Sequence, residues 1–305
     1  MTNSLLLSDR THMFISGGVK MYERFISTKN NITWHIYESG QDNKDTIFLI
    51  AGFPQSAYAW RKTLPLLAKQ YHVLAIDLPG QGYSSVPWSG YDIKTAAQRI
   101  HELVIKLELK KVLYVGHDVG SWIGFTYAHL FPDDLLGIAL IDANIPGVTL
   151  QRQIPLDTES WRSWHFLFNA IPDLPEELLK DKERVLLEWF FSKKAYNWRS
   201  AFTEKDIDEY VREYRQLGVM RGMLGYYRAV LDDFKINKPL CEEKIVPPIL
   251  TISGEFGSSQ DLFENLKVLG KMVTGKVIKG SGHYIPEEKP QELAAQISEF
   301  IRKLI

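Results

Sequence analysis

The chain has 305 residues, of which 45% are apolar, and a formal net charge of −1. This length and apolar content allow one large domain with a substantial core, with or without an inserted subdomain. The near-zero charge gives no electrostatic footprint for nucleic acid or an anionic membrane. The single cysteine, Cys241, excludes an internal disulfide and a multi-cysteine metal site, and it fits a reducing cytoplasm.

The N-terminal stretch "MTNSLLLSDRTHMF" has no basic beginning and no adequate apolar run, so we predict no signal peptide. The longest apolar runs, such as "TIFLIAGF", are too short to span a bilayer. Short β-rich runs recur from there on, and the later ones are continuously apolar, as in parallel strands buried on both faces. In chain order the predicted strands lie in residues 32–39, 46–53, 72–80, 112–118, 135–143, 248–255 and 275–283.

Helical patterns separate several of these strands. Residues 91–107 and 293–304 each place their apolar side chains on one helical face. Alternating strands and helices predict an α/β fold with a mostly parallel sheet. The alternation stops over residues 147–236, which read as successive helices. We therefore predict a core of residues 1–146 and 237–305 with a helical cap inserted over the carboxyl ends of the strands, where open α/β sheets bind ligands.

The stretch "VLYVGHDVGSWIGF" reads as a strand, a tight turn and a helix. Its turn, Gly116 to Gly120, matches the spacing Gly-x-nucleophile-x-Gly, in which two glycines let the strand and the helix approach closely. The central residue, Asp118, then projects from the turn. The plainer alternative is that Asp118 is a helix N-cap, a frequent role of aspartate.

Two further loops bear on the same chemistry. "GSGHYIPEEKP" places His283 after the last predicted strand, the chain position at which an α/β-hydrolase carries its base. "AGFPQS" follows an earlier strand and can supply a backbone N–H at Phe53. A single loop histidine is otherwise most often a surface residue.

These motifs, with "DLPGQGYS", "GHDVGSW" and the helical cap, resemble α/β-hydrolases of the epoxide hydrolase and haloalkane or haloacetate dehalogenase group, most of all Cif-type bacterial epoxide hydrolases. In that group the nucleophile is an aspartate, here Asp118. It attacks an sp3 carbon and forms an alkyl ester, which water activated by His283 then hydrolyses. The resemblance implies an oxyanion hole from the N–H groups of Phe53 and Val119. Ala51 departs from the pattern, because this loop usually begins with histidine.

The carboxylate that orients His283 has two candidate positions. Many α/β-hydrolases carry it where this chain has Gly257, and Glu255 and Asp261 lie near but out of register. The other placement is after the preceding strand, which offers Asp142. We predict Asp142, with Glu255 as the second choice, whereas the plainer alternative makes Asp142 a strand-end turn residue.

The cap residues His165 and Tyr227 resemble the histidine and tyrosine that open the ring in Cif-type epoxide hydrolases. An opening epoxide needs a proton donor for its oxygen, whereas a halide needs only hydrogen-bond donors. The same resemblance places Phe166, Trp122 and Tyr226 against an apolar substrate. The plainer alternative for His165 and Tyr227 is that both are amphipathic aromatic residues of the core.

The main prediction is an epoxide hydrolase that uses water and no cofactor or metal, in the cytoplasm, as a monomer or homodimer. A haloacetate or haloalkane dehalogenase is the first alternative. It fits less well because Val119 stands where haloalkane dehalogenases carry tryptophan, and because the arginines that hold a haloacetate carboxylate are missing here. A catalytically silent binding protein is the second alternative, which Ala51 and the displaced orienting acid allow.

Overall fold

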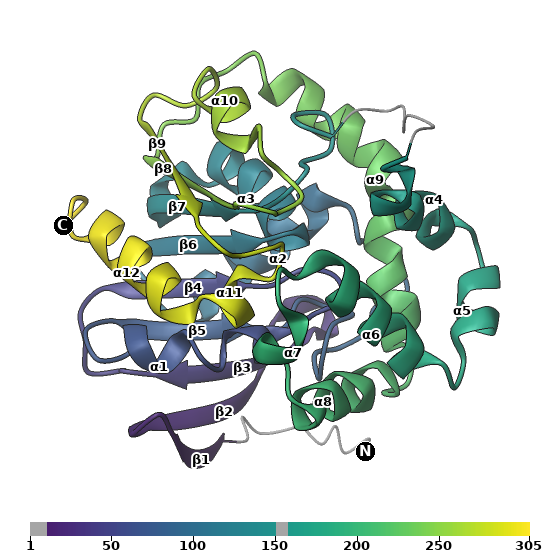
Figure 1. The fold of residues 1–305 in the computed structure, drawn as a ribbon. Helices are drawn as coiled ribbons and strands as arrows, with labels where there is room; N and C mark the ends of the chain where they lie inside the picture. The colour runs from purple at the N-terminus through teal and green to yellow at the C-terminus, as the bar shows by residue number, and fades with distance from the viewer. Residues whose placement is uncertain (1–10, 151–157) are drawn as a thin grey trace, which may run out of the picture.

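The computed structural model describes residues 11–150 and 158–305. Within them, one nine-stranded sheet carries helices on both faces, and a group of further helices gathers at one end of it (Figure 1). Residues 1–10, which hold most of the stretch considered as a signal peptide, lie outside the described residues, as do residues 151–157 of the predicted cap. None of the helices in the described part is long and apolar enough to cross a membrane.

The strands are β1 (Thr11–Ser16), β2 (Val19–Ser27), β3 (Thr33–Ser39), β4 (Thr46–Ile50), β5 (His72–Ile76), β6 (Val112–His117), β7 (Leu135–Ile141), β8 (Ile249–Gly254) and β9 (Val273–Ile278). The helices beside the sheet are α1 (Leu64–Leu67), α2 (Ile93–Lys106), α3 (Val119–Leu130), α10 (Leu262–Leu266), α11 (Ile285–Glu288) and α12 (Pro290–Ile301). The inserted helices are α4 (Trp164–Ala170), α5 (Leu174–Leu179), α6 (Glu183–Lys194), α7 (Trp198–Ala201), α8 (Glu204–Tyr214) and α9 (Val219–Leu240).

The strand order is β1-β2-β3-β5-β4-β6-β7-β8-β9. The first three strands pair antiparallel, as do β3 and β5, and every pair from β5 through β9 is parallel. The carboxyl ends of the parallel strands therefore share one edge. The loops after β4, β6, β7 and β9, which hold the predicted site residues, all leave from that edge.

Strand β4 is an example of why the parallel strands are apolar throughout. Ile47 and Leu49 face the core layer under α1 and α12, whereas Phe48 and Ile50 face the layer under α2, α3 and α10. Successive side chains of a strand point to opposite faces, so a strand covered on both sides needs an apolar residue at each position. The mostly parallel α/β sheet predicted from these runs is confirmed.

All seven predicted strands are present, but two strands lacked a clear signal. β1 and β2 form an antiparallel edge, and in β2 only Met21 and Ile26 are buried, with half-buried aromatic and charged residues between them. No continuous apolar run marks such a strand. The helical segment also extends further than predicted, because α9 continues past residue 236 to Leu240.

Candidate active site

The turn after β6 holds Asp118 in an unusual backbone conformation, with φ 53° and ψ −118°. The flanking glycines allow it. A Cβ atom on Gly116 would lie 2.4 Å from the Gly120 carbonyl oxygen, and one on Gly120 would lie 2.3 Å from the Ile50 carbonyl oxygen. The strand, the turn and α3 therefore pack so closely that only glycine fits beside Asp118.

The Asp118 side chain does not cap α3. It makes no cap hydrogen bond, and its Oδ1 atom instead accepts the Phe53 backbone N–H at 2.8 Å. Val119 is the first residue of α3, so its N–H is one of the amides that have no partner within the helix. A Cβ on Gly52 would lie 2.3 Å from Asp118 Oδ1 and 2.4 Å from the Val119 nitrogen. The two predicted oxyanion-hole residues thus flank the Asp118 carboxylate.

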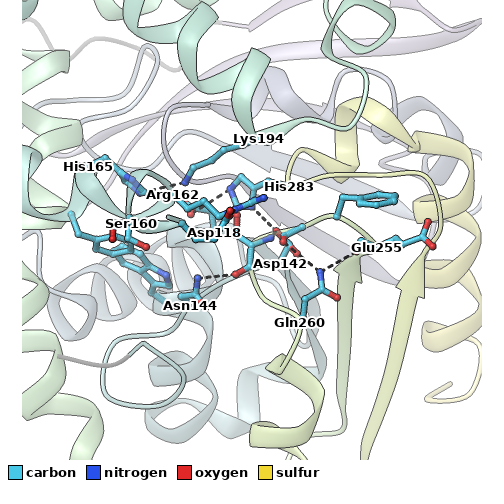
Figure 2. Close-up of a pocket in the computed structure, with 17 residues that line it drawn as sticks. Asp118, Asp142, Asn144, Ser160, Arg162, His165, Lys194, Glu255, Gln260 and His283 are labelled. Atoms are coloured by element: carbon cyan, nitrogen blue, oxygen red, sulfur yellow. Dashed lines mark hydrogen bonds and ion pairs between the residues drawn. The ribbon is translucent and has the colours of Figure 1, made fainter. Parts of the chain in front are cut away.

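His283 and Asp142 meet beside the Asp118 turn. His283 Nδ1 lies 2.6 Å from Asp142 Oδ2, and His283 Nε2 lies 3.6 Å from Asp118 Oδ2 (Figure 2). A hydrogen bond from Nδ1–H to the carboxylate leaves Nε2 as the acceptor that faces Asp118. Both His283 and Asp142 are buried, so His283 is not a surface residue.

Gly257 stands where many relatives of the predicted group carry the orienting acid, and the structure gives a steric reason. A Cβ on Gly257 would lie 2.1 Å from Asp142 Oδ1. The Asp142 carboxylate also accepts the backbone N–H of Ser258 at 2.8 Å and that of Gly254 at 3.3 Å. The Asp142 carboxylate, after β7, thus occupies the space that a side chain at position 257, after β8, would need. Glu255, the second choice, instead accepts the Gly280 N–H at 2.9 Å.

Burial controls the ionisation of His283. It lowers the pKa of His283 to about 4, while the nearby Asp118 charge acts in the opposite direction. The imidazole is therefore neutral near pH 7, as a base must be. The backbone of His283 is fixed on both sides: its N–H donates to the Lys194 carbonyl at 2.9 Å, and its carbonyl accepts from His117 Nε2 at 2.8 Å.

The cap brings His165 and Tyr227 together above the Asp118 turn. Their ring centroids lie 5.6 Å apart, and the Tyr227 ring packs edge-on against Phe53 at 5.1 Å. His165 Nδ1 is buried without a hydrogen-bond partner among the described residues. Burial and then the Asp118 charge raise the pKa of Tyr227 well above its ordinary value. The phenol therefore stays protonated and can donate a hydrogen bond.

Of the other three predicted substrate contacts, two line the cavity and one does not. Phe166 and Trp122 line a cavity of about 460 Å³ that also contains Asp118 and His283. Their rings stack with centroids 5.8 Å apart. Neither Tyr226 nor Tyr227 lines this cavity. The structure contradicts the predicted contact of Tyr226, because its hydroxyl donates to the Pro79 carbonyl at 2.9 Å. The Tyr227 ring instead packs behind the two lining rings, with its centroid 5.7 Å from that of Trp122 and 5.4 Å from that of Phe166.

Several residues around this cavity were not predicted from the sequence. The polar ones are Asn144, Glu159, Ser160, Arg162, Ser163, Lys194, Ser258 and Gln260. They belong to no short motif, so only their position in the fold identifies them. Within residues 11–150 and 158–305, no group of three or more histidine, cysteine or acidic side chains is arranged to hold a metal ion.

Comparisons with known proteins relate the chain to one family and to solved structures. Residues 45–290 match the family described as alpha/beta hydrolase fold. A soluble epoxide hydrolase from Corynebacterium sp. (strain C12) is 31% identical over 247 residues, which is 80% of this chain and 86% of that protein. A fluoroacetate dehalogenase from a Burkholderia species is 25% identical over 92% of this chain and 94% of its own. The crystal structure of wild-type Cfl2 from Burkholderia cenocepacia has a TM-score of 0.91 and 38% identity, covering 96% of this chain and all of that one.

Proposed function

The chain belongs to the alpha/beta hydrolase fold family, and from this premise we propose that it hydrolyses epoxides to vicinal diols through a covalent ester on Asp118. The observation that carries the proposal is the pairing of two buried donors, His165 and Tyr227, above a carboxylate that His283 can reach. Epoxide hydrolases among its relatives support the same reaction class.

In the first step, Asp118 Oδ2 attacks an oxirane carbon and the carbon–oxygen bond of the ring breaks. The ring oxygen takes the electron pair and receives a proton or a strong hydrogen bond from Tyr227 and His165. The Phe53 N–H already holds Asp118 Oδ1 at 2.8 Å, which leaves Oδ2 to face the substrate and His283. The product is an alkyl ester of Asp118.

In the second step, His283 Nε2 removes a proton from water, and the water oxygen attacks Cγ of Asp118. The negative charge of the tetrahedral intermediate develops on Oδ1, beside the N–H groups of Phe53 and Val119. Asp142 stabilises the imidazolium that forms on His283. Collapse of the intermediate expels the second oxygen of the diol as an alkoxide, which takes the proton from His283. Asp118 is regenerated as a carboxylic acid, and its proton returns through solvent to the group that protonated the ring oxygen, Tyr227 or His165, which restores the carboxylate.

An aspartate is the right nucleophile for this substrate. Attack on an sp3 carbon by a serine would give an ether, which has no carbonyl carbon for water to attack. The Asp118 ester has one, so the same side chain can be regenerated. The phenol of Tyr227 stays protonated, because burial and the Asp118 charge raise its pKa, and it can donate a strong hydrogen bond to the developing alkoxide, which is a strong base. A halide would gain little from such an acid.

Tyr227→Phe tests the ring-opening pair, because it keeps the ring and its packing while it deletes the donor. We expect ester formation with styrene oxide to slow by roughly 10²- to 10⁴-fold, the usual effect of a positioned acid. His165→Phe should act on the same step. Stopped-flow measurement separates ester formation from ester hydrolysis, and only the first should change.

Tyr226→Phe is the matched control, because its hydroxyl bonds to Pro79 outside the cavity. If Tyr227→Phe and His165→Phe both form the ester at the parent rate, the ring-opening roles fail. If the parent enzyme releases halide from haloacetate and leaves epoxides untouched, the dehalogenase alternative replaces the proposed function.

Asp142→Asn tests the orienting acid. The amide cannot stabilise the imidazolium, so we expect hydrolysis of the ester to slow by roughly 10³- to 10⁴-fold. Glu255→Gln should leave that step unchanged, because the Glu255 carboxylate bonds to Gly280. Single-turnover decay of the ester measures both. A severe defect in Glu255→Gln with none in Asp142→Asn would reverse the assignment.

A further inference from the structure

Lys194 is a cation inside the cavity that the proposed mechanism leaves without a role. It is the last residue of α6, and its side chain lines the same space as Asp118, His165 and His283. The backbone bond from His283 N–H to the Lys194 carbonyl fixes this residue beside the catalytic loop. Figure 2 shows its side chain extended toward His165.

No described carboxylate forms an ion pair with the Lys194 ammonium. Lys194 Nζ lies 3.5 Å from His165 Nε2 and 5.4 Å from the centroid of the Phe190 ring. Burial lowers the pKa of Lys194 to about 8, while Asp118 and Asp142 act in the opposite direction. The side chain is therefore mostly charged near pH 7. A partly desolvated cation without a paired anion is costly, so an anion that enters the cavity would gain from it.

The other charges around the cavity leave this position available. Arg162 also lines the cavity, but its Nε–H donates to Glu159. The Glu255 carboxylate points away from Lys194 (Figure 2) and accepts the Gly280 N–H. The positive charge that a ligand would meet is thus mainly that of Lys194, next to His165 and a short distance from the nucleophile.

We propose that Lys194 binds a carboxylate on the substrate, so that the preferred substrates are epoxides that carry an acidic group a few bonds from the oxirane. This inference rests on the proposed function and narrows its substrate class. Lys194 lies next to His165, which donates a hydrogen bond to the ring oxygen in the proposed mechanism. The carboxylate and the oxirane must therefore be close together in the substrate. The ammonium also offsets the repulsion between the bound carboxylate and Asp118.

Phenylglycidate and phenylglycidamide test the proposal, because the acid and its primary amide share one shape and differ in charge. The parent enzyme should prefer the acid. In Lys194→Met the ratio of kcat/KM for the acid to that for the amide should fall by about 10- to 100-fold, the scale of one charge-assisted hydrogen bond. The loss should lie in KM for the acid. Lys194→Arg, which keeps a cation, should retain the preference.

Lys193→Met is the control variant, since Lys193 is its exposed neighbour on α6 and should leave the ratio at the parent value. Equal losses on acid and amide in Lys194→Met would overturn the proposal, because Lys194 would then serve ring opening or the fold. A parent enzyme that prefers the amide would also overturn it.

Binding of an unreactive ligand separates this inference from the proposed function. If the parent enzyme turns over none of the three epoxides (phenylglycidate, phenylglycidamide and styrene oxide), the epoxide hydrolase proposal fails. Calorimetry with phenylacetate and phenylacetamide then still reports on Lys194. Tighter binding of phenylacetate, lost in Lys194→Met, would support the anion site. Equal binding of the two ligands by the parent enzyme would exclude it.

Discussion

Asp118→Asn is expected to lose turnover of epoxides by on the order of 10⁵- to 10⁶-fold, the scale seen when a hydrolase nucleophile is removed. A neutral amide is a poor nucleophile toward an sp3 carbon, and the neighbouring Asp142 carboxylate is buried and bonded to His283, so it cannot take over the role. The amide has almost the same volume, so the turn after β6 should persist. Steady-state diol production measures the loss.

Two controls are needed for Asp118→Asn. A nearby activated water can convert the new asparagine back to aspartate, so the intact mass must be checked before and after the assay. The thermal unfolding midpoint should stay close to that of the parent enzyme. Parent-level turnover by protein that still has the asparagine mass would show that Asp118 is not the nucleophile.

His283→Gln is expected to block the second step while it spares the first. In the proposed mechanism, ester formation uses Asp118 and the cap donors, whereas ester hydrolysis needs the base at Nε2, which lies 3.6 Å from Asp118 Oδ2. Turnover should fall by on the order of 10⁵-fold. One equivalent of epoxide should be consumed, and the protein should become heavier by one substrate mass.

His129→Gln supplies the matched control for His283→Gln, because His129 lies in the last turn of α3, away from the cavity. It should turn over epoxides as the parent enzyme does. A His283→Gln variant that neither gains mass nor consumes epoxide would mean that His283 is also needed for ester formation, and the division of labour between the two steps would be wrong.

The sheet and the turn at Asp118 could be predicted because their physical demands appear directly in the chain. Strands covered on both faces must be apolar throughout, as Ile47 to Ile50 are. The close approach of β6 and α3 admits only glycine at positions 116 and 120. Asp142 could be proposed because Gly257 leaves no carboxylate at the alternative position, and the structure adds that the two positions share one space.

Other features depend on contacts that no local pattern reveals. Tyr226 and Tyr227 are adjacent on α9, and only the rotation of that helix sends one hydroxyl to Pro79 and the other ring to Phe53. The sequence likewise does not show which of the adjacent Lys193 and Lys194 lines the cavity. The bond between the Lys194 carbonyl and His283, which lies far along the chain, turns one of them into the cavity. Long-range packing decides both cases.

The origin of the oxygen in the product tests the central claim, a covalent ester on Asp118, most directly. The parent enzyme, in excess over styrene oxide, is allowed one turnover in water labelled with heavy oxygen. In the proposed mechanism water attacks Cγ of Asp118, so the diol takes its new oxygen from the carboxylate. We predict an unlabelled diol and heavy oxygen in the peptide that contains Asp118. A labelled diol with an unlabelled Asp118 peptide would mean that water opens the epoxide directly, and it would contradict the ester mechanism.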